Sequence, residues 1–387
     1  MSSICHLLGD SKYGGGSKVV LGLCGKMISE GHDVFIVTTD LALEEEIKNV
    51  GGEPVRIDCI RRAVRPLWDL VGLIRLVRHL RRAKYDLVHT HTSKAGMIGR
   101  LACRMARVPA VIHTVHGFAF HEQSRPAVVS LLSLLEHIAA SWCDRIVTVS
   151  RFHRAWALRL GIAEPDKIIA IPNGIDSIPG ITSERRLKVR EQLGIAHDQI
   201  LILGLGRLAE QKGFEDLLKA VPVIQGLSTK GFKVVIAGEG PKRADLEAMI
   251  DQLSINESVE LIGFSSDISG LFGAADLVVQ PSLWEGLSIS LLEAMSAGKA
   301  VVTTTIESNI EVVGETGCAS LVPVNNPKEL AATVADLMGD EVARSHIEAK
   351  AREVYEAEYT CTRMHDNYAA LYGELLRPSI AVGEGAS

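Results

Sequence analysis

Residues 280–303 read Gln-Pro-Ser-Leu-Trp-Glu-Gly-Leu-Ser-Ile-Ser-Leu-Leu-Glu-Ala-Met-Ser-Ala-Gly-Lys-Ala-Val-Val-Thr. The apolar run 277–279 in front of this stretch is typical of a buried parallel strand. Gly286 permits a tight bend, and a helix is expected to begin near Ser288 and to end at Gly298, before the next strand. The stretch therefore predicts a strand–loop–helix–strand unit of an open α/β sheet, in which ligands bind at the carboxyl ends of the strands.

Two carboxylates lie eight residues apart in this stretch, Glu285 in the loop and Glu293 in the helix. Carboxylates suit the capture of vicinal hydroxyls, as on a ribose or a pyranose. As a bare pair they are more often a solvated loop residue and a residue of an amphipathic helix. Their function is therefore decided by the motifs around them.

The rest of the chain alternates apolar strands with amphipathic helices. Strands are expected at 4–8, 33–37, 53–57, 86–90, 110–115, 145–149 and 167–171, and then at 200–204, 232–237, 259–262, 276–280, 300–303 and 319–322. Helices are expected at 17–29, 42–50, 66–83, 93–106, 125–141 and 150–160, and at the end of the chain at 341–358 and 361–376. A Pro- and Gly-containing break at 174–182 separates the two series. This βα repeat predicts an α/β protein of two Rossmann-like parallel-sheet domains.

Composition agrees with two globular domains. The 387 residues are 47% hydrophobic and 23% charged, which is ordinary for a globular chain of this length. The seven cysteines are scattered without close pairs, which favours a reducing compartment over a disulfide framework. No signal peptide is recognised, and the apolar segment 127–140 is too short to span a bilayer. We expect a cytoplasmic protein.

Charge is distributed unevenly along the chain. The net charge is −6, whereas Arg56 to Arg107 holds thirteen Lys or Arg and three Asp, a local balance of +10. Within it, 71–82 alternates aliphatic residues with arginines. Such a helix can lie on an anionic membrane surface, or it can cover a sheet and present a basic face to water. Nucleic-acid binding is disfavoured because little aromatic interleaving and no binding module accompany the charge.

Two glycine-rich loops are candidates for binding phosphate. Gly14-Gly15-Gly16 precedes a helix, so backbone N–H groups can approach an anion there. The segment 204–209 fits a dinucleotide fingerprint, but residues 210–213 intervene before the next helix and the acidic residue expected about 20 positions later is missing. We favour Arg207 and Lys212, five residues apart on one loop, as ligands of a diphosphate.

Histidines cluster near strand ends in the first half of the chain. His116 follows the strand 110–115 and is either structural or a hydrogen-bonding group of a site. His89, His91 and His113 also lie near such ends, but no Asp-x-Asp motif accompanies them. No metal site is assigned.

Several motifs together resemble the retaining glycosyltransferases of family 4, whose architecture is named GT-B. The resemblance covers about residues 4–376. Its motifs are Glu-x7-Glu at 285–293, Gly-Arg-Leu with Lys-Gly at 206–213, Ala-Gly-Glu-Gly-Pro at 237–241, Ile-Gly-Phe at 262–264, His-Thr-Ser-Lys-Ala-Gly at 91–96 and Thr-Val-His-Gly-Phe at 114–118. The last two suggest the branch that builds bacterial surface polysaccharides.

The resemblance implies a domain plan. It places an acceptor-side domain at 1–175, a nucleotide-sugar domain at 182–355 and a helix at 356–376 that crosses back to the first domain. The two domains are expected to face each other across a cleft, which closes about the 174–182 linker. A disordered tail is expected at 378–387.

The resemblance also implies the reaction and its residues. A hexosyl or N-acetylhexosaminyl group moves from a nucleoside diphosphate sugar, taken as UDP-linked, to a saccharide or polyprenyl-diphosphate-linked acceptor, with retention and without a metal or other cofactor. The implied catalytic residues are His116, Arg207, Lys212 and Glu285. The implied donor-binding residues are Gly15, Gly16, Gly206, Gly240, Gly263, Phe264, Gly286, Leu287, Ser288 and Glu293. Segment 61–107 is the candidate membrane surface on the inner face of the cytoplasmic membrane, and no nucleic-acid partner is expected.

Two departures from the family pattern leave the donor sugar open. Ser288 stands where the family often has proline, and Glu307-Ser308-Asn309 precedes Glu311 where a glycine pair is common. Two alternatives also stay open: another GT-B enzyme of sugar nucleotides, such as an epimerase or a synthase, and a silent sugar-nucleotide-binding partner subunit.

Overall fold

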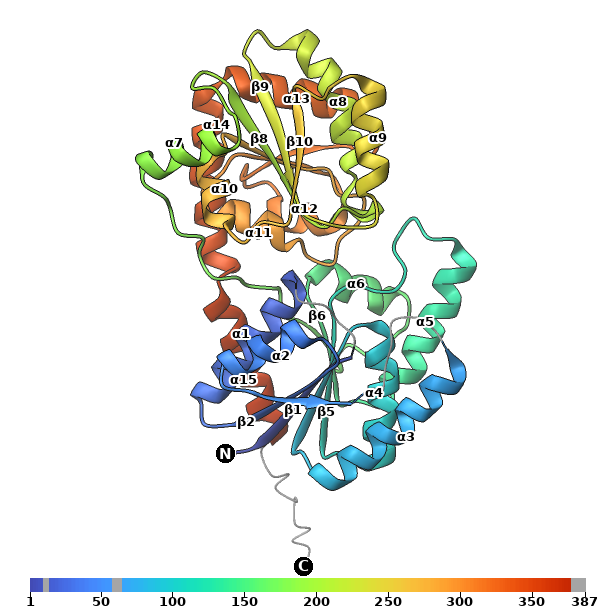
Figure 1. The fold of residues 1–387 in the computed structure, drawn as a ribbon. Coiled ribbons are helices and arrows are strands. Elements are labelled where there is room, and N and C mark those ends of the chain that lie inside the picture. The colour runs from blue at the N-terminus through green and yellow to red at the C-terminus, as the bar shows by residue number, and fades with distance from the viewer. Residues whose placement is uncertain (10–13, 58–64, 377–387) are drawn as a thin grey trace, which may run out of the picture. The chain divides into compact units, whose positions relative to one another are not determined.

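The protein forms two α/β units, shown in Figure 1, in a computed structural model that describes residues 1–9, 14–57 and 65–376. The predicted tail, Cys59 and residues 61–64 of the basic segment lie outside the described residues. One unit contains the chain up to Pro172 together with the segment that starts at Thr362, and the other runs from Asn173 to Cys361. The predicted fold class of two parallel-sheet domains is confirmed.

The first unit contains a seven-stranded parallel sheet of order β3-β2-β1-β4-β5-β6-β7. Its strands are β1 (Ser3–Gly9), β2 (Asp33–Thr38), β3 (Glu53–Arg56), β4 (Leu87–His91), β5 (Ala110–Val115), β6 (Arg145–Thr148) and β7 (Ile168–Ala170). Its helices are α1 (Gly15–Ser29), α2 (Leu41–Asn49), α3 (Pro66–Ala83), α4 (Ser93–Ala106), α5 (Pro126–Ala140), α6 (Arg151–Arg159) and α15 (Cys361–Leu376).

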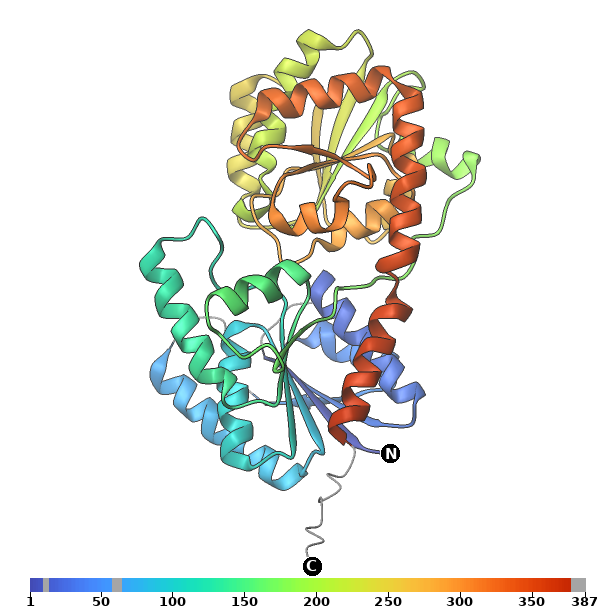
Figure 2. The ribbon, with the colours of Figure 1, turned by 180° about the vertical axis from the view of Figure 1, so that it is seen from behind.

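Helices cover both faces of this sheet, and each face has its own core. One core includes residues of α3, α4, α5 and α6, and the other includes residues of α1, α2 and α15. Met364, Tyr368, Leu371 and Tyr372 of α15 are buried in the second of these cores. The helix itself lies beside the first sheet in the view from behind (Figure 2). The last helix of the chain thus completes the core of the first unit.

The second unit contains a six-stranded parallel sheet of order β10-β9-β8-β11-β12-β13. Its strands are β8 (Ile200–Leu205), β9 (Phe232–Ala237), β10 (Val259–Gly263), β11 (Leu277–Gln280), β12 (Val301–Thr304) and β13 (Ser320–Val322). Its helices are α7 (Ser183–Gln192), the 3₁₀ turn η1 (Glu210–Lys212), α8 (Phe214–Leu227), α9 (Arg243–Leu253), α10 (Ile268–Ala274), α11 (Ile289–Ser296), α12 (Glu307–Val313), α13 (Pro327–Gly339) and α14 (Glu341–Glu358).

Local sequence explains where the helices begin. Prolines at the first helical position start α3, α5 and α13, where their missing N–H group is not needed. Asp40 and Ser288 cap α2 and α11 by accepting from backbone N–H groups three residues later. The helix α8 begins only at Phe214, after η1, which agrees with the rejection of a dinucleotide site at 204–209.

In both sheets the strand order reverses beside the strand that comes first in the sequence. In the first sheet β1 lies between β2 and β4, and in the second β8 lies between β9 and β11. Ligands of open α/β sheets bind at such switch points, outside the carboxyl ends of the strands. The candidate residues of each unit are therefore expected after β1 and β4 and after β8 and β11.

Candidate active site

The two loops at the switch point of the second sheet are joined to each other. The loop after β8 spans 206–213 and the loop after β11 spans 281–288. The backbone N–H of Leu283 donates to the carbonyl oxygen of Gln211 at 2.8 Å. Gly213 has φ +62°, and a Cβ placed on it would lie 2.0 Å from the carbonyl oxygen of Pro281. Only glycine fits this contact, so the sequence fixes how closely the loops approach.

Glu285 is anchored where these loops meet. Its Oε1 accepts from Lys212 Nζ at 2.6 Å and from Ser282 Oγ at 3.0 Å. Its Oε2 accepts from Gln211 Nε2 at 2.9 Å. The Glu285 side chain is 8% exposed and that of Lys212 is 15% exposed. The structure therefore brings together Lys212 and Glu285, two of the implied catalytic residues.

Two predicted site residues of the second unit are exposed, the catalytic candidate Arg207 and the donor-binding candidate Phe264. Arg207 follows β8 and is exposed, and a Cβ placed on Gly206 beside it would lie 3.1 Å from the Lys212 side chain. Phe264 follows β10 and is 71% exposed. Its neighbour Gly263 lies against the side chains of Glu239 and Arg243, which form an ion pair of 3.0 Å. A guanidinium and an aromatic face are thus accessible at the carboxyl ends of β8 and β10.

Two other predicted donor residues are held by packing. A Cβ on Gly240 would lie 2.1 Å from the carbonyl oxygen of Leu208, so this glycine permits the loops after β8 and β9 to touch. The side chain of Leu287 is 5% exposed. Any contact that these residues make with a ligand would use their backbone.

The start of α11 explains the departure at Ser288. Its hydroxyl is buried, caps the helix by accepting from Leu291 N–H, and is bonded by Gln280 Nε2. Gly286 precedes it in the loop and is partly buried. Glu293 lies in the second turn of α11 and is also partly buried. Ser288 thus fixes the end of the Glu285 loop and the start of the Glu293 helix.

The second departure, at 307–311, fills the sheet end with amide and hydroxyl groups. Asn309 is fully buried, and its Nδ2 donates to Thr303 Oγ1 at 2.8 Å and to the carbonyl oxygen of Thr304 at 3.1 Å. Among the described residues, Asn309 Oδ1 and Ser308 Oγ are buried without a hydrogen-bond partner. The segment thus keeps unused polar capacity beside β12.

In the first unit, the glycine triplet lies at the start of α1. Gly15 and Gly16 are the first two helical residues and both are exposed. Ser17 Oγ accepts from Gly14 N–H at 2.8 Å and donates to the Gly14 carbonyl at 2.9 Å. A Cβ on Gly14 or Gly16 would meet nothing within 4 Å. Packing does not require glycine at these two positions, and the predicted ligand contact of Gly15 and Gly16 stays a prediction.

His116 belongs to a group of histidines on one face of the first sheet. It is partly buried, and its Nε2 shares a hydrogen bond of 3.1 Å with Nδ1 of His91. His91 Nε2 shares another of 3.1 Å with Nδ1 of His6. Burial lowers the pKa of His116 to about 4 and that of His6 to about 3, and it lowers the pKa of His91 well below its usual value. These imidazoles are neutral at neutral pH.

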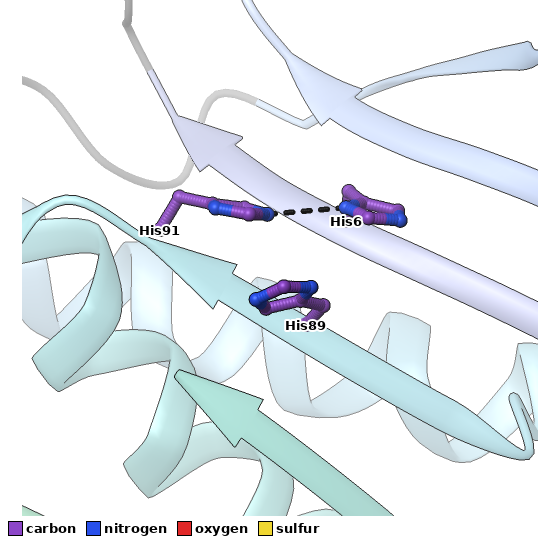
Figure 3. A group of neighbouring side chains, drawn as sticks. All are labelled: His6, His89 and His91. Atoms are coloured by element: carbon purple, nitrogen blue, oxygen red, sulfur yellow. Dashed lines mark hydrogen bonds between the residues drawn. The ribbon is translucent and has the colours of Figure 1, made fainter. Parts of the chain in front are cut away.

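His89 lies beside this group with different partners. Its Nδ1 and Nε2 are hydrogen-bonded to Tyr372 Oη at 2.5 Å and to Thr114 Oγ1 at 2.7 Å. Within the described residues, His6, His89 and His91 each bring a ring nitrogen to within 4.8 Å of the others, the spacing of a metal site. Figure 3 shows the ring edges of His6 and His91 directed at each other. Because five of the six ring nitrogens already have hydrogen-bond partners, the arrangement does not fit an ion better than it fits a hydrogen-bonded cluster.

Packing explains Gly96 of the motif at 91–96 and Arg100 in the helix that follows it. A Cβ on Gly96 would overlap the ring of His113, whose Nδ1 shares a hydrogen bond with Thr90. Arg100 is fully buried and pairs with Glu136 of α5 at 2.7 Å. Arg100 therefore joins α4 to α5, and Gly96 lets α4 pack against β5.

Sequence reasoning missed three residues of these groups. Gln211 and Ser282 hold Glu285, and His6 joins the histidines from a strand that reads as wholly apolar. The signal for Gln211 and Ser282 was their place in the predicted loops. No local sequence signal marked His6, because its place opposite His89 depends on the pairing of β1 with β4.

Comparison with known proteins gives the family. Residues 13–177 match the family described as "Glycosyltransferase Family 4", and residues 185–354 match "Glycosyl transferases group 1". The chain therefore belongs to these glycosyltransferases, as its motifs predicted, and it is a hexosyltransferase with the GT-B fold.

Individual relatives agree with this assignment. The chain is 33% identical over 253 residues, 64% of its length and 65% of the relative's, to the UDP-Gal:alpha-D-GlcNAc-diphosphoundecaprenol alpha-1,3-galactosyltransferase of Escherichia coli. This match spans just under two thirds of that protein. The chain is 26% identical, over 90% of its length and 91% of the relative's, to the capsular polysaccharide biosynthesis glycosyltransferase CapM of Staphylococcus aureus. Among solved structures, Anabaena Alr3699/HepE in complex with UDP and glucose has a TM-score of 0.84 at 20% identity, covering 97% of this chain and all of that one, which is a likeness of fold.

Proposed function

We propose that the chain transfers a hexosyl group from a UDP-sugar to a lipid-linked saccharide, with retention at the anomeric carbon. The observation that carries the proposal is the pairing of Lys212 with Glu285 on two joined loops beside the exposed Arg207. A cation and a carboxylate at one switch point match the two ends of the bond that breaks, a diphosphate and a sugar. The names of the relatives from Escherichia coli and Staphylococcus aureus favour the acceptor class and surface polysaccharide as the product.

In the proposed mechanism the donor takes over both members of the ion pair. Lys212 Nζ turns to the diphosphate, and the Glu285 oxygens turn to the sugar hydroxyls while Gln211 and Ser282 hold the carboxylate. Negative charge grows on the diphosphate as the glycosidic bond breaks, and Arg207 and Lys212 stabilise it as preorganised donors. No step of this scheme requires a metal ion.

The other predicted site residues have separate roles in this proposal. Glu293 holds the ribose hydroxyls, and the exposed ring of Phe264 beside Gly263 lies against the base. His116 contributes a neutral hydrogen-bonding group next to the transferred sugar, and Gly15 and Gly16 let backbone N–H groups approach the donor phosphates or the acceptor. Glu285 is not a nucleophile here, because a double displacement needs a second carboxyl group beside the same bond.

The test uses a panel of UDP-, GDP- and ADP-sugars with the wild-type chain, Glu285→Gln and the exposed control Glu257→Gln. One sugar nucleotide should raise the melting temperature by mass action and be slowly hydrolysed by wild type and by Glu257→Gln. Hydrolysis should be lost in Glu285→Gln. With an undecaprenyl-diphosphate saccharide added, the product should keep the anomeric configuration of the donor. Inversion, an epimerised nucleotide sugar, or binding without turnover would overturn the proposal.

We also propose that the first unit lies on an anionic membrane through α3 and α5. Among the described helices none is both long and apolar enough to cross a bilayer. The two helices lie on the same side of the sheet (Figure 1). Both expose apolar side chains, namely Leu67, Trp68, Leu70, Val71, Ile74, Val128, Leu131, Leu134 and Ile138. Arg75, Arg78, Arg81 and Arg82 of α3 are exposed as well. Aliphatic contact with the acyl boundary and attraction to anionic lipids favour the same orientation.

Vesicle binding tests this surface. The affinity for vesicles that contain phosphatidylglycerol, measured by sedimentation, should fall by about fivefold for each arginine of α3 replaced by glutamine. Leu131→Ser should weaken it further, whereas Leu187→Ser, an equally exposed leucine of α7, should not. Equal binding by all variants, or equal binding to neutral vesicles, would contradict the proposal.

A further inference from the structure

Three histidines form a hydrogen-bonded chain across the middle of the first sheet. His6 lies on β1, His91 ends β4, and His116 follows β5. The rings of His6 and His91 are nearly parallel, 9° apart, and share their bond edge to edge, as Figure 3 shows. His6 and His91 are at most 1% exposed, whereas His116 is partly exposed. The row of hydrogen-bonded histidines thus runs from the interior of the first unit to His116, a residue of the proposed site.

A neutral imidazole has one N–H donor and one bare nitrogen acceptor. Three neutral imidazoles in a row can therefore be bonded in only two directions. Outward, His6 donates to His91 and His91 donates to Nε2 of His116, which then carries its proton on Nδ1. Inward, His116 donates from Nε2, His91 donates from Nε2, and the proton of His6 is left on its own Nε2.

His6, at the inner end of the row of histidines, decides between these two directions of hydrogen bonding. His6 Nε2 is buried and, among the described residues, has no hydrogen-bond partner. The outward direction leaves a bare acceptor there, and the inward direction leaves an N–H group. Orphaned buried N–H groups are the rarer of the two in native proteins. The outward direction is thus the favoured one.

We propose that His91 is a positioning residue that holds His116 as its Nδ1–H tautomer, with His6 setting the direction of the chain from the interior. His116 then presents an N–H donor to its ligand and not a bare nitrogen. Such a donor suits an oxygen acceptor, a hydroxyl of the transferred sugar or an oxygen of its phosphate; this identity of the ligand rests on the proposed function. His89 takes no part, because Tyr372 and Thr114 occupy both of its ring nitrogens.

Nitrogen NMR of the full chain labelled with ¹⁵N-histidine tests the tautomer without any donor or acceptor. The His116 signals, assigned by their loss in His116→Gln, should show a protonated Nδ1 and a bare Nε2 at pH 7. The reverse pattern, or a cation, would overturn the proposal. Because no substrate is present, this result stands apart from success or failure of the transferase assay.

Variants separate positioning from simple structural support. His91→Phe keeps a ring but removes the bond, so the His116 signals should become those of two exchanging tautomers. His89→Phe, on the same strand and equally buried, should leave the Nδ1–H pattern unchanged. His6→Gln, whose amide can accept as well as donate, should weaken the preference. In transfer assays His91→Phe should lower kcat by about two- to tenfold, the worth of one neutral hydrogen bond, with donor KM unchanged. An unchanged His116 pattern in His91→Phe would overturn the proposal.

Discussion

The switch points of the two sheets have the same strand order, but the side chains at one are ionised and those at the other are neutral. In the second unit, the loops after β8 and β11 hold an ammonium, a carboxylate and an exposed guanidinium. In the first unit, β1, β4 and β5 bring together imidazoles whose burial lowers the pKa and leaves them neutral. Ion pairing favours the charged forms of Lys212 and Glu285 in the second unit, whereas desolvation favours the neutral form of the histidines in the first. In the function proposed above, the ionised groups of the second unit bind the diphosphate and the sugar hydroxyls, and the neutral His116 adds a hydrogen bond to the transferred sugar.

The largest effect is expected where the charged region meets the leaving group. Lys212→Met keeps the aliphatic stem but removes the ammonium, and transfer should fall by about 10²- to 10³-fold, the loss found when one preorganised donor is removed. Steady-state kinetics with the sugar nucleotide that the donor panel selects would measure this fall. Lys219→Met, an exposed lysine of α8, is the control and should stay near wild type. A fall of less than fivefold for Lys212→Met would indicate that the diphosphate is held elsewhere.

Alanine substitutions of one glycine in each unit should differ in their effect on the free energy of unfolding. Gly213→Ala forces a Cβ into a left-handed residue and against Pro281, so the free energy of unfolding should fall by about 1–3 kcal/mol. Gly16→Ala adds a Cβ that meets nothing, and stability should change by less than about 0.5 kcal/mol. Urea denaturation measures both. If Gly16→Ala keeps its stability but loses transfer activity, the glycine triplet serves a ligand; full activity would remove it from the proposed site.

The smallest expected effect is a change in how the free energy of unfolding depends on pH. His6 has its pKa lowered to about 3 in the folded state, so below about pH 6.5 the unfolded chain binds a proton that the folded chain does not. Stability due to this residue is therefore present at neutral pH and is lost as pH falls, by about 1.4 kcal/mol per pH unit. Denaturation at pH 7, 6 and 5 should show a shallower slope for His6→Phe than for wild type. Equal slopes would mean that His6 titrates normally in the folded protein.

Local sequence predicted most of the fold, because buried parallel strands are continuous apolar runs and helix starts carry their own signals. The expected strand at 110–115 and the helices at 66–83, 93–106, 341–358 and 361–376 have the bounds found in the structure. Lys212 and Glu285 were predicted as residues of one site from the family's motifs, and in the structure they follow the neighbouring strands β8 and β11.

What the sequence did not predict depends on strand order and register. His6 meets His91 because β1 lies beside β4, two elements separated by some 80 residues of chain, and no local pattern encodes that pairing. The cover of His89 by Tyr372 likewise requires α15 to lie on the first sheet. The hydroxyl of Ser288, a predicted donor-binding residue, caps α11, and its contact with a donor stays a prediction.

Isothermal titration with UDP and with the matching UDP-sugar tests the central claim, that Glu285 holds the sugar while Glu293 holds the ribose. The wild-type chain should bind the UDP-sugar more tightly than UDP. Glu285→Gln should abolish that difference without weakening UDP, because UDP has no sugar for the carboxylate and Lys212 is released from its partner. Glu293→Gln should weaken both ligands alike. If Glu285→Gln weakened UDP and the UDP-sugar by the same factor, the assignment of Glu285 to the sugar would be wrong.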